Sequence, residues 1–99
     1  MSVLVGEGKF RYEALASWPK LPDGINLIET PGIGVNSYDQ IHIFSRNTNH
    51  PVMIFDKSGN FQTSFGKGIF SDRTHGMFIG PDDSIFCVDD GIHTITKFS

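Results

Sequence analysis

The stretch that decides the fold is His75-Gly-Met-Phe-Ile-Gly-Pro-Asp-Asp-Ser-Ile-Phe-Cys-Val-Asp-Asp-Gly-Ile-His-Thr-Ile-Thr-Lys-Phe98. It contains three short runs, 76–79, 84–88 and 93–98, that are rich in Ile, Val, Phe and Thr. Gly80-Pro81-Asp82-Asp83 separates the first two runs, and these are residues that favour turns. Runs of this length and composition predict β-strands joined by tight turns.

The same pattern occurs once earlier in the chain. The first matched pairs, 44 positions apart, are Ile33 with Met77, Val35 with Ile79, Asp39 with Asp83 and Ile41 with Ile85. After a slip of one residue the match resumes, from His50 on His93 to Phe55 on Phe98. A repeat of about 43 residues built from short strands has the size of one β-propeller blade, typically about 40–50 residues.

The remaining runs fit an all-β, propeller-type organisation. We expect blade one over 32–65 and an incomplete blade two over 76–98, preceded by a closing strand over 10–16. The two four-stranded antiparallel blades are circularly permuted, because a strand at the start of the chain is of the kind that completes the last blade of a closed propeller. Within this chain we expect that closing strand to be unpaired. Residues 18–24 read as a Pro-rich connector, and Gly6-Glu7-Gly8 reads as a mobile terminus.

Two blades form only part of a ring and leave two apolar faces open. We expect either the remaining blades of a six-bladed chain or a homotrimer of this chain to complete it. The expected blade core consists of Val35, Ile41, Ile43, Val52, Ile54, Phe55, Ile79, Ile85, Cys87, Ile95 and Phe98.

Composition excludes several classes of protein. The chain has 99 residues, 38% of them apolar, and a formal net charge of −3, so no basic surface for nucleic acid is expected. A single cysteine, Cys87, excludes an intrachain disulfide and a Cys-based zinc site. No apolar run is long enough for a membrane span, and no signal peptide is visible, which favours the cytoplasm.

The segment 75–98 resembles an NHL repeat, with Asp89 and His93 at two of the pattern's positions. Over about residues 10–99 the chain is similar to the six-bladed propellers of the peptidyl-α-hydroxyglycine α-amidating lyase family and its bacterial relatives. The residues that carry this likeness are Trp18-Pro-Lys-Leu-Pro22, Ile43-Phe44-Ser45-Arg46, His50-Pro51-Val52 and Thr74-His75-Gly76.

The resemblance implies a metal site and an activity. It makes His75 one of three zinc-binding histidines, although Thr74 stands where the family usually has Pro, and it places Arg46 in the catalytic site. It assigns a structural calcium to the backbone carbonyls of Ile33 and Met77. In that family the other two zinc histidines and a catalytic Tyr come from later blades. The implied reaction is zinc-dependent cleavage of a peptide's C-terminal α-hydroxyglycine to a peptide amide and glyoxylate; the alternative is a non-catalytic scaffold that binds a protein or peptide.

From the residues alone, His75 can bind zinc or cap a strand, and Arg46 can hold a carboxylate or lie solvated at a blade rim. His50 and His93 occupy one repeat position, so we expect each ring to bond a loop carbonyl, while His42 faces a neighbouring blade. The paired acids are expected to be structural; they are Asp82, Asp83, Asp89 and Asp90. Cys87 is expected to be a buried, inert thiol.

Overall fold

The computed structural model describes residues 2–99, a part of the chain that contains nine β-strands and no helix. The strands are β1 (Ser2–Glu7), β2 (Phe10–Leu15), β3 (Gly32–Val35), β4 (Ile41–Phe44), β5 (Val52–Phe55), β6 (Phe61–Phe65), β7 (Thr74–Ile79), β8 (Ile85–Asp89) and β9 (Thr94–Phe98). The prediction of an all-β chain is therefore confirmed.

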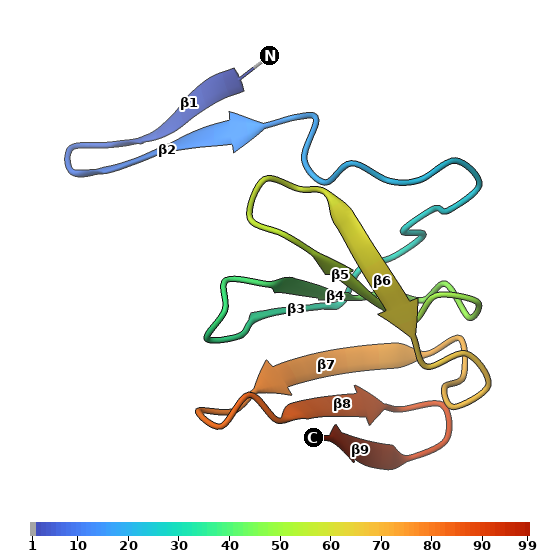
Figure 1. Cartoon of the computed structure of the whole chain (residues 1–99). Coiled ribbons are helices and arrows are strands. Elements are labelled where there is room, and N and C mark those ends of the chain that lie inside the picture. The colour runs from blue at the N-terminus through green and yellow to red at the C-terminus, as the bar shows by residue number, and fades with distance from the viewer. Residues whose placement is uncertain (1) are drawn as a thin grey trace.

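The strands form three antiparallel sheets with neighbours in chain order (Figure 1). Sheet one has the order β3-β4-β5-β6, sheet two has the order β7-β8-β9, and β1 pairs with β2 in a separate hairpin. The four strands of sheet one fill the predicted range 32–65, and the three strands of sheet two lie within two residues of the runs predicted for them.

Three turns that join neighbouring strands share one geometry. Each contains the same two backbone hydrogen bonds: Asn36 N to Gln40 O with Asp39 N to Asn36 O, Asp56 N to Asn60 O with Gly59 N to Asp56 O, and Gly80 N to Ser84 O with Asp83 N to Gly80 O. The fourth turn residue has a positive φ in each case, 58° at Asp39, 88° at Gly59 and 66° at Asp83. Asp tolerates this left-handed conformation better than most side chains do, which explains why Asp recurs there.

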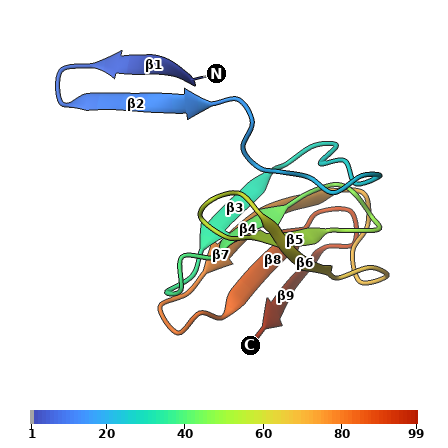
Figure 2. The same ribbon diagram turned by 45° about the horizontal axis from the view of Figure 1, so that its top comes forward.

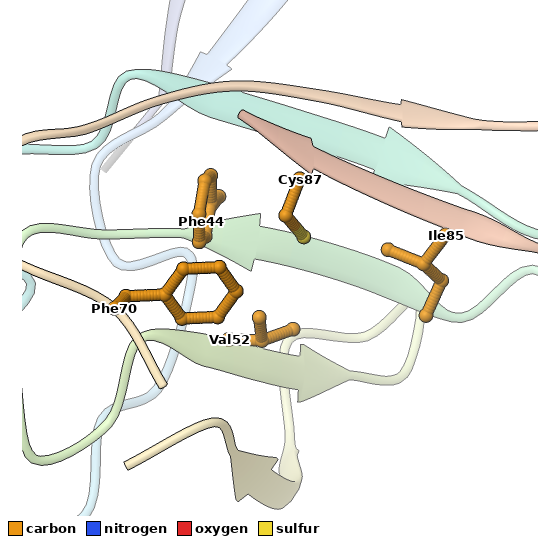
Figure 3. Close-up of a cluster of buried hydrophobic side chains, with 5 residues drawn as sticks. All are labelled: Phe44, Val52, Phe70, Ile85 and Cys87. Atoms are coloured by element: carbon orange, nitrogen blue, oxygen red, sulfur yellow. The ribbon is translucent and has the colours of Figure 1, made fainter. Parts of the chain in front are cut away.

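Sheets one and two pack face to face. The core between them is a cluster of Phe44, Val52, Phe70, Ile85 and Cys87, shown in Figure 3. The Phe44 and Phe70 rings meet edge to face, with centroids 5.0 Å apart. The first strands of the two sheets also approach closely, since a Cβ on Gly34 would lie 2.8 Å from Ile79 Cγ1.

The opposite face of sheet one carries a second core. Its buried residues Ile43, Met53 and Phe55 are covered by the connector before β3, through Trp18, Ile25 and Leu27. Of the two faces expected to lie open, this one is therefore largely covered by the chain itself.

The outer face of sheet two is the uncovered one. Alternation along the strands and the strand register place Phe78, Val88 and Ile95 on it, and all three are exposed. Ile95 is 74% exposed, so its expected burial was wrong: β9 turns Phe98, not Ile95, toward sheet one.

Val35 is the second residue wrongly assigned to the core, at 54% exposed, because the connector covers β4 and β5 but not the end of β3. The other expected core residues are buried or half-buried; they are Ile41, Ile43, Val52, Ile54, Phe55, Ile79, Ile85, Cys87 and Phe98.

The leading strand differs from its prediction. It spans Phe10–Leu15, close to the predicted 10–16, and is paired along its length with β1, so the expectation of an unpaired strand was wrong. Gly6-Glu7-Gly8, expected to be a mobile terminus, lies at the turn end of this hairpin. Gly8 and Lys9 form the two-residue turn, with φ 62° at Gly8. Both strands lie apart from the two stacked sheets (Figure 2).

Candidate functional site

Arg46 lies two residues beyond the end of β4, where its position is fixed by three contacts. Its backbone N–H donates to the Glu29 carbonyl at 2.8 Å. Its guanidinium Nε donates to the Thr74 carbonyl at 3.1 Å, and Nη1 lies 3.4 Å from Glu29 Oε1. The guanidinium is therefore held across the junction between the two sheets, and its side chain is 27% exposed.

Thr74 and His75 open β7 at the same end of the sheets. Thr74 is buried, and its hydroxyl donates to the Ser45 carbonyl at 2.8 Å. His75 follows it directly and is exposed. Arg46 thus bonds the residue that precedes His75, so the two residues singled out in the sequence lie at one end of neighbouring strands. Thr74 stands where the resembled family usually has Pro, and its hydroxyl donates a hydrogen bond that Pro could not make.

Charged groups surround this pair. Arg73 binds Asp90 in a bidentate ion pair, with Nε to Oδ1 at 2.9 Å and Nη2 to Oδ2 at 3.2 Å. This bond is the main cause that holds the pKa of Asp90 below its usual value, and the charges of His75 and Arg46 add to it. The sequence reasoning missed Arg73 and Glu29, although Arg73 stands only two residues before His75.

The described residues of one chain do not make a catalytic zinc site. Within residues 2–99 there is no cluster of three or more His, Cys, Asp or Glu side chains placed to hold a metal. A catalytic zinc typically takes three protein ligands, whereas His75 would supply one. Ile33 and Met77, the expected calcium positions, lie on the neighbouring strands β3 and β7, and two carbonyls are fewer than the six to eight oxygens that calcium takes.

The remaining histidines have separate roles. His50 Nδ1 lies 2.7 Å from Ser64 Oγ, and His93 takes a left-handed φ of 56° in the turn before β9. The expectation that both rings bond a loop carbonyl was therefore wrong for His50, which bonds a side chain.

His42 is buried on the face of β4 that also carries Phe44, toward sheet two, as expected. Burial is the main cause that lowers its pKa.

The four acids of sheet two make structural contacts. Asp83 accepts hydrogen bonds from the Ser37 backbone and hydroxyl and so joins the two sheets, while Asp82 accepts one from Ser84 N at 3.1 Å. Asp90 pairs with Arg73 as described above.

Asp89 is the most buried of these acids. It accepts hydrogen bonds from the backbone and hydroxyl of Ser71 and from the Gly91 backbone. Burial opposes its ionisation, but these bonds outweigh burial and lower its pKa.

Cys87 is fully buried, and burial raises its pKa to about 12. A thiol with this pKa stays protonated at neutral pH and is a poor nucleophile and metal ligand. The expected burial of Cys87 is confirmed.

A shallow open pocket of about 470 Å³ lies at the other end of sheet one, before β4 and after β5. Its lining consists of Tyr38, Asp39, Gln40, Asp56, Lys57 and Gln62. Asp56 is committed to the local turn, accepting hydrogen bonds from Ser58 and Asn60, and these bonds lower its pKa.

Residues 2–99 include no helix that is long and apolar enough to cross a membrane. A scan against protein-family models finds no match for the chain, and a search of curated proteins finds no relative.

Proposed function

We propose that the chain is a two-blade unit of an NHL-type propeller with an amidating-lyase-like function, and that Arg46 and His75 belong to one substrate site. The reaction is cleavage of a peptide's C-terminal α-hydroxyglycine, which releases a peptide amide and glyoxylate. The single observation that carries the proposal is the bond from Arg46 Nε to the carbonyl of Thr74, the residue before His75.

The arrangement of the sheets supports the propeller. Two antiparallel sheets of consecutive strands stack face to face, and their first strands, β3 and β7, run side by side. The turns after these two strands have the same hydrogen bonds and a positive-φ Asp at matched positions. Blades of a propeller stack in this way around an axis lined by their first strands.

Arg46 has the chemistry to hold the substrate carboxylate. Its Nε is engaged by Thr74 and one Nη by Glu29, which fixes the plane of the guanidinium and leaves further N–H donors. A guanidinium oriented in this way binds a carboxylate through paired hydrogen bonds. The nearby Arg73 is committed to Asp90, so Arg46 is the better candidate of the two.

His75 would be the residue of this chain that contributes to a metal. Bound zinc would act as a Lewis acid on the substrate hydroxyl. Because one chain brings a single ligand, further histidines have to come from other blades or other copies.

Glyoxylate release tests the proposal. The assembled ring, completed by further blades or by other copies of the chain, is incubated with zinc and a peptide ending in α-hydroxyglycine, and glyoxylate is measured. We expect His75→Ala to abolish release and Arg46→Ala to raise KM at least about tenfold, the effect of losing one charge-assisted contact. Arg73→Ala is the matched control and should retain activity.

Absence of glyoxylate from the assembled wild-type ring would contradict the lyase and leave the non-catalytic scaffold as the function. That second function is favoured by the exposed outer face of sheet two, where Phe78 is 62% exposed. Peptide binding that survives both His75→Ala and Arg46→Ala would place recognition elsewhere than at this site.

A further inference from the structure

The hairpin of β1 and β2 is amphipathic, yet nothing in residues 2–99 covers it. The register pairs Val3 with Ala14, Val5 with Tyr12 and Glu7 with Phe10, so these side chains share one, largely apolar face. Tyr12 is 64% exposed and Phe10 63%. The opposite face mixes Leu4 and Leu15 with Arg11 and Glu13. An isolated two-stranded hairpin is only marginally stable in water, so this one would gain stability if it were added to another sheet.

Sheet two offers a place for an added strand. In sheet one the fourth strand, β6, covers the edge of β5 and packs Phe61 against Phe55 at a centroid distance of 5.7 Å. In sheet two the third strand, β9, is the equivalent of β5 and pairs only with β8 among the described residues, so its outer edge carries unpaired backbone groups. The adjoining outer face of sheet two is apolar and exposed, at Val88 and Ile95.

The chain's own hairpin is tethered on the wrong side to fill this place. Trp18, three residues after Leu15, packs on Phe55 in the core that faces away from sheet two, and its indole Nε1 bonds the Lys57 carbonyl at 3.3 Å. Lys20 N bonds Gly59 O at 2.8 Å nearby. Three residues span about 10 Å at most, roughly the spacing of two packed sheets, while sheet one itself stands between Trp18 and sheet two. Figure 1 shows the hairpin and β9 at opposite ends of the molecule.

We propose that the β1–β2 hairpin docks on a second copy of this chain, with β2 pairing along the outer edge of that copy's β9. The backbone hydrogen bonds of the added strand supply affinity, as in other cases of β-strand addition. The apolar face of the hairpin, with Val5, Phe10 and Tyr12, then continues the exposed apolar face of sheet two. Because the two surfaces differ, the contact is head-to-tail, and copies close into a ring or extend into a chain.

Association state is the first test. Sedimentation of the full chain over a range of concentrations should show self-association. Removal of residues 1–15 or the double change Phe10→Lys with Tyr12→Lys should weaken it at least about tenfold, since buried aromatic side chains dominate such contacts. Glu13→Lys, on the opposite face of β2, is the matched control and should associate like the wild type. Retention of the Trp18 fluorescence of the wild type shows that the core under the connector remains folded.

Hydrogen exchange locates the contact. Backbone amides of β9 should become protected as concentration rises and lose that protection when residues 1–15 are removed. A chain that stays monomeric overturns the proposal. So does an assembly that persists without the hairpin, or one in which β9 amides exchange at the monomer's rate. None of these outcomes depends on glyoxylate release, so the proposed activity and this contact fail separately.

Discussion

At the scale of single residues, polar side chains at strand ends hold the two sheets in register. Thr74 bonds the Ser45 carbonyl, Arg46 bonds the Thr74 carbonyl, and Asp83 bonds Ser37. These contacts join segments far apart in the sequence. They also set the candidate site, since two of them fix the surroundings of His75.

Thr74→Val tests the first of these contacts. The change leaves the shape of the buried side chain but removes its hydroxyl, so the Ser45 carbonyl loses a donor. We expect the free energy of unfolding to fall by about 1–3 kcal/mol, measured by urea denaturation. Thr63→Val, at an exposed position of β6, should change it by less than about 0.5 kcal/mol. Equal values for the two variants would show that the hydroxyl contributes nothing.

Asp89 predicts a pH dependence of stability. Its pKa is lower in the folded chain than the ordinary value of about 3.9, so the ionised form stabilises the fold. This contribution is complete well above pH 4 and is lost as the pH falls through the folded-state pKa. Urea denaturation between pH 7 and pH 2.5 should show this loss in the wild type but a smaller one in Asp89→Asn. The exposed Asp72→Asn control should follow the wild type, and identical profiles for all three would contradict the role of Asp89.

At the scale of elements, alternation and turn residues predict most strands, because one face of each strand is buried. They failed for β1, whose Val3, Leu4 and Val5 form a continuous apolar run with no buried face to produce alternation. They also misplaced Ile95, since alternation marks two faces but does not say which one meets another sheet. In the candidate site, Arg46 and His75 came from a resemblance. Glu29 was missed, because its contact depends on how the connector folds.

Gly34 tests the close approach of the first strands. A Cβ there would lie 2.8 Å from Ile79 Cγ1, so Gly34→Ala should push β3 from β7 and cost about 1–3 kcal/mol. Gly76→Ala, on β7, is the matched control because nothing lies within 4 Å of its added Cβ. Thermal or urea unfolding compares the two. A Gly34→Ala chain as stable as Gly76→Ala would mean that β3 and β7 are further apart than described.

At the scale of the whole molecule, the fold is two sheets stacked on one core, with a second core under the connector and a separate hairpin. Only one broad apolar face of the stack, on sheet two, is left uncovered within the described residues. The self-association proposed above uses that face and the hairpin, and the Arg46–His75 end lies at the junction of the two sheets.

Ile85→Ala and Ile95→Ala test which face of sheet two meets sheet one. Ile85 lies in the core between the sheets, so its truncation should cost about 2–5 kcal/mol. Ile95 is exposed, so its truncation should change the stability of the isolated chain by less than about 0.5 kcal/mol. Urea denaturation at low protein concentration measures both. A reversed order would mean that the sheets stack through their other faces.

The central claim is that Arg46 and His75 form one site, and NMR titration tests it most directly. The full chain is titrated with a non-cleavable peptide ending in a 2-hydroxy acid, while the Arg46 Nε–H and the His75 ring signals are followed. The account predicts that the Arg46 and His75 signals both shift with the same dissociation constant and that Arg46→Ala abolishes the His75 shift. The Arg73 signal should not shift, because Arg73 remains paired with Asp90. Binding that leaves both signals unmoved, or moves only one of them, would contradict it.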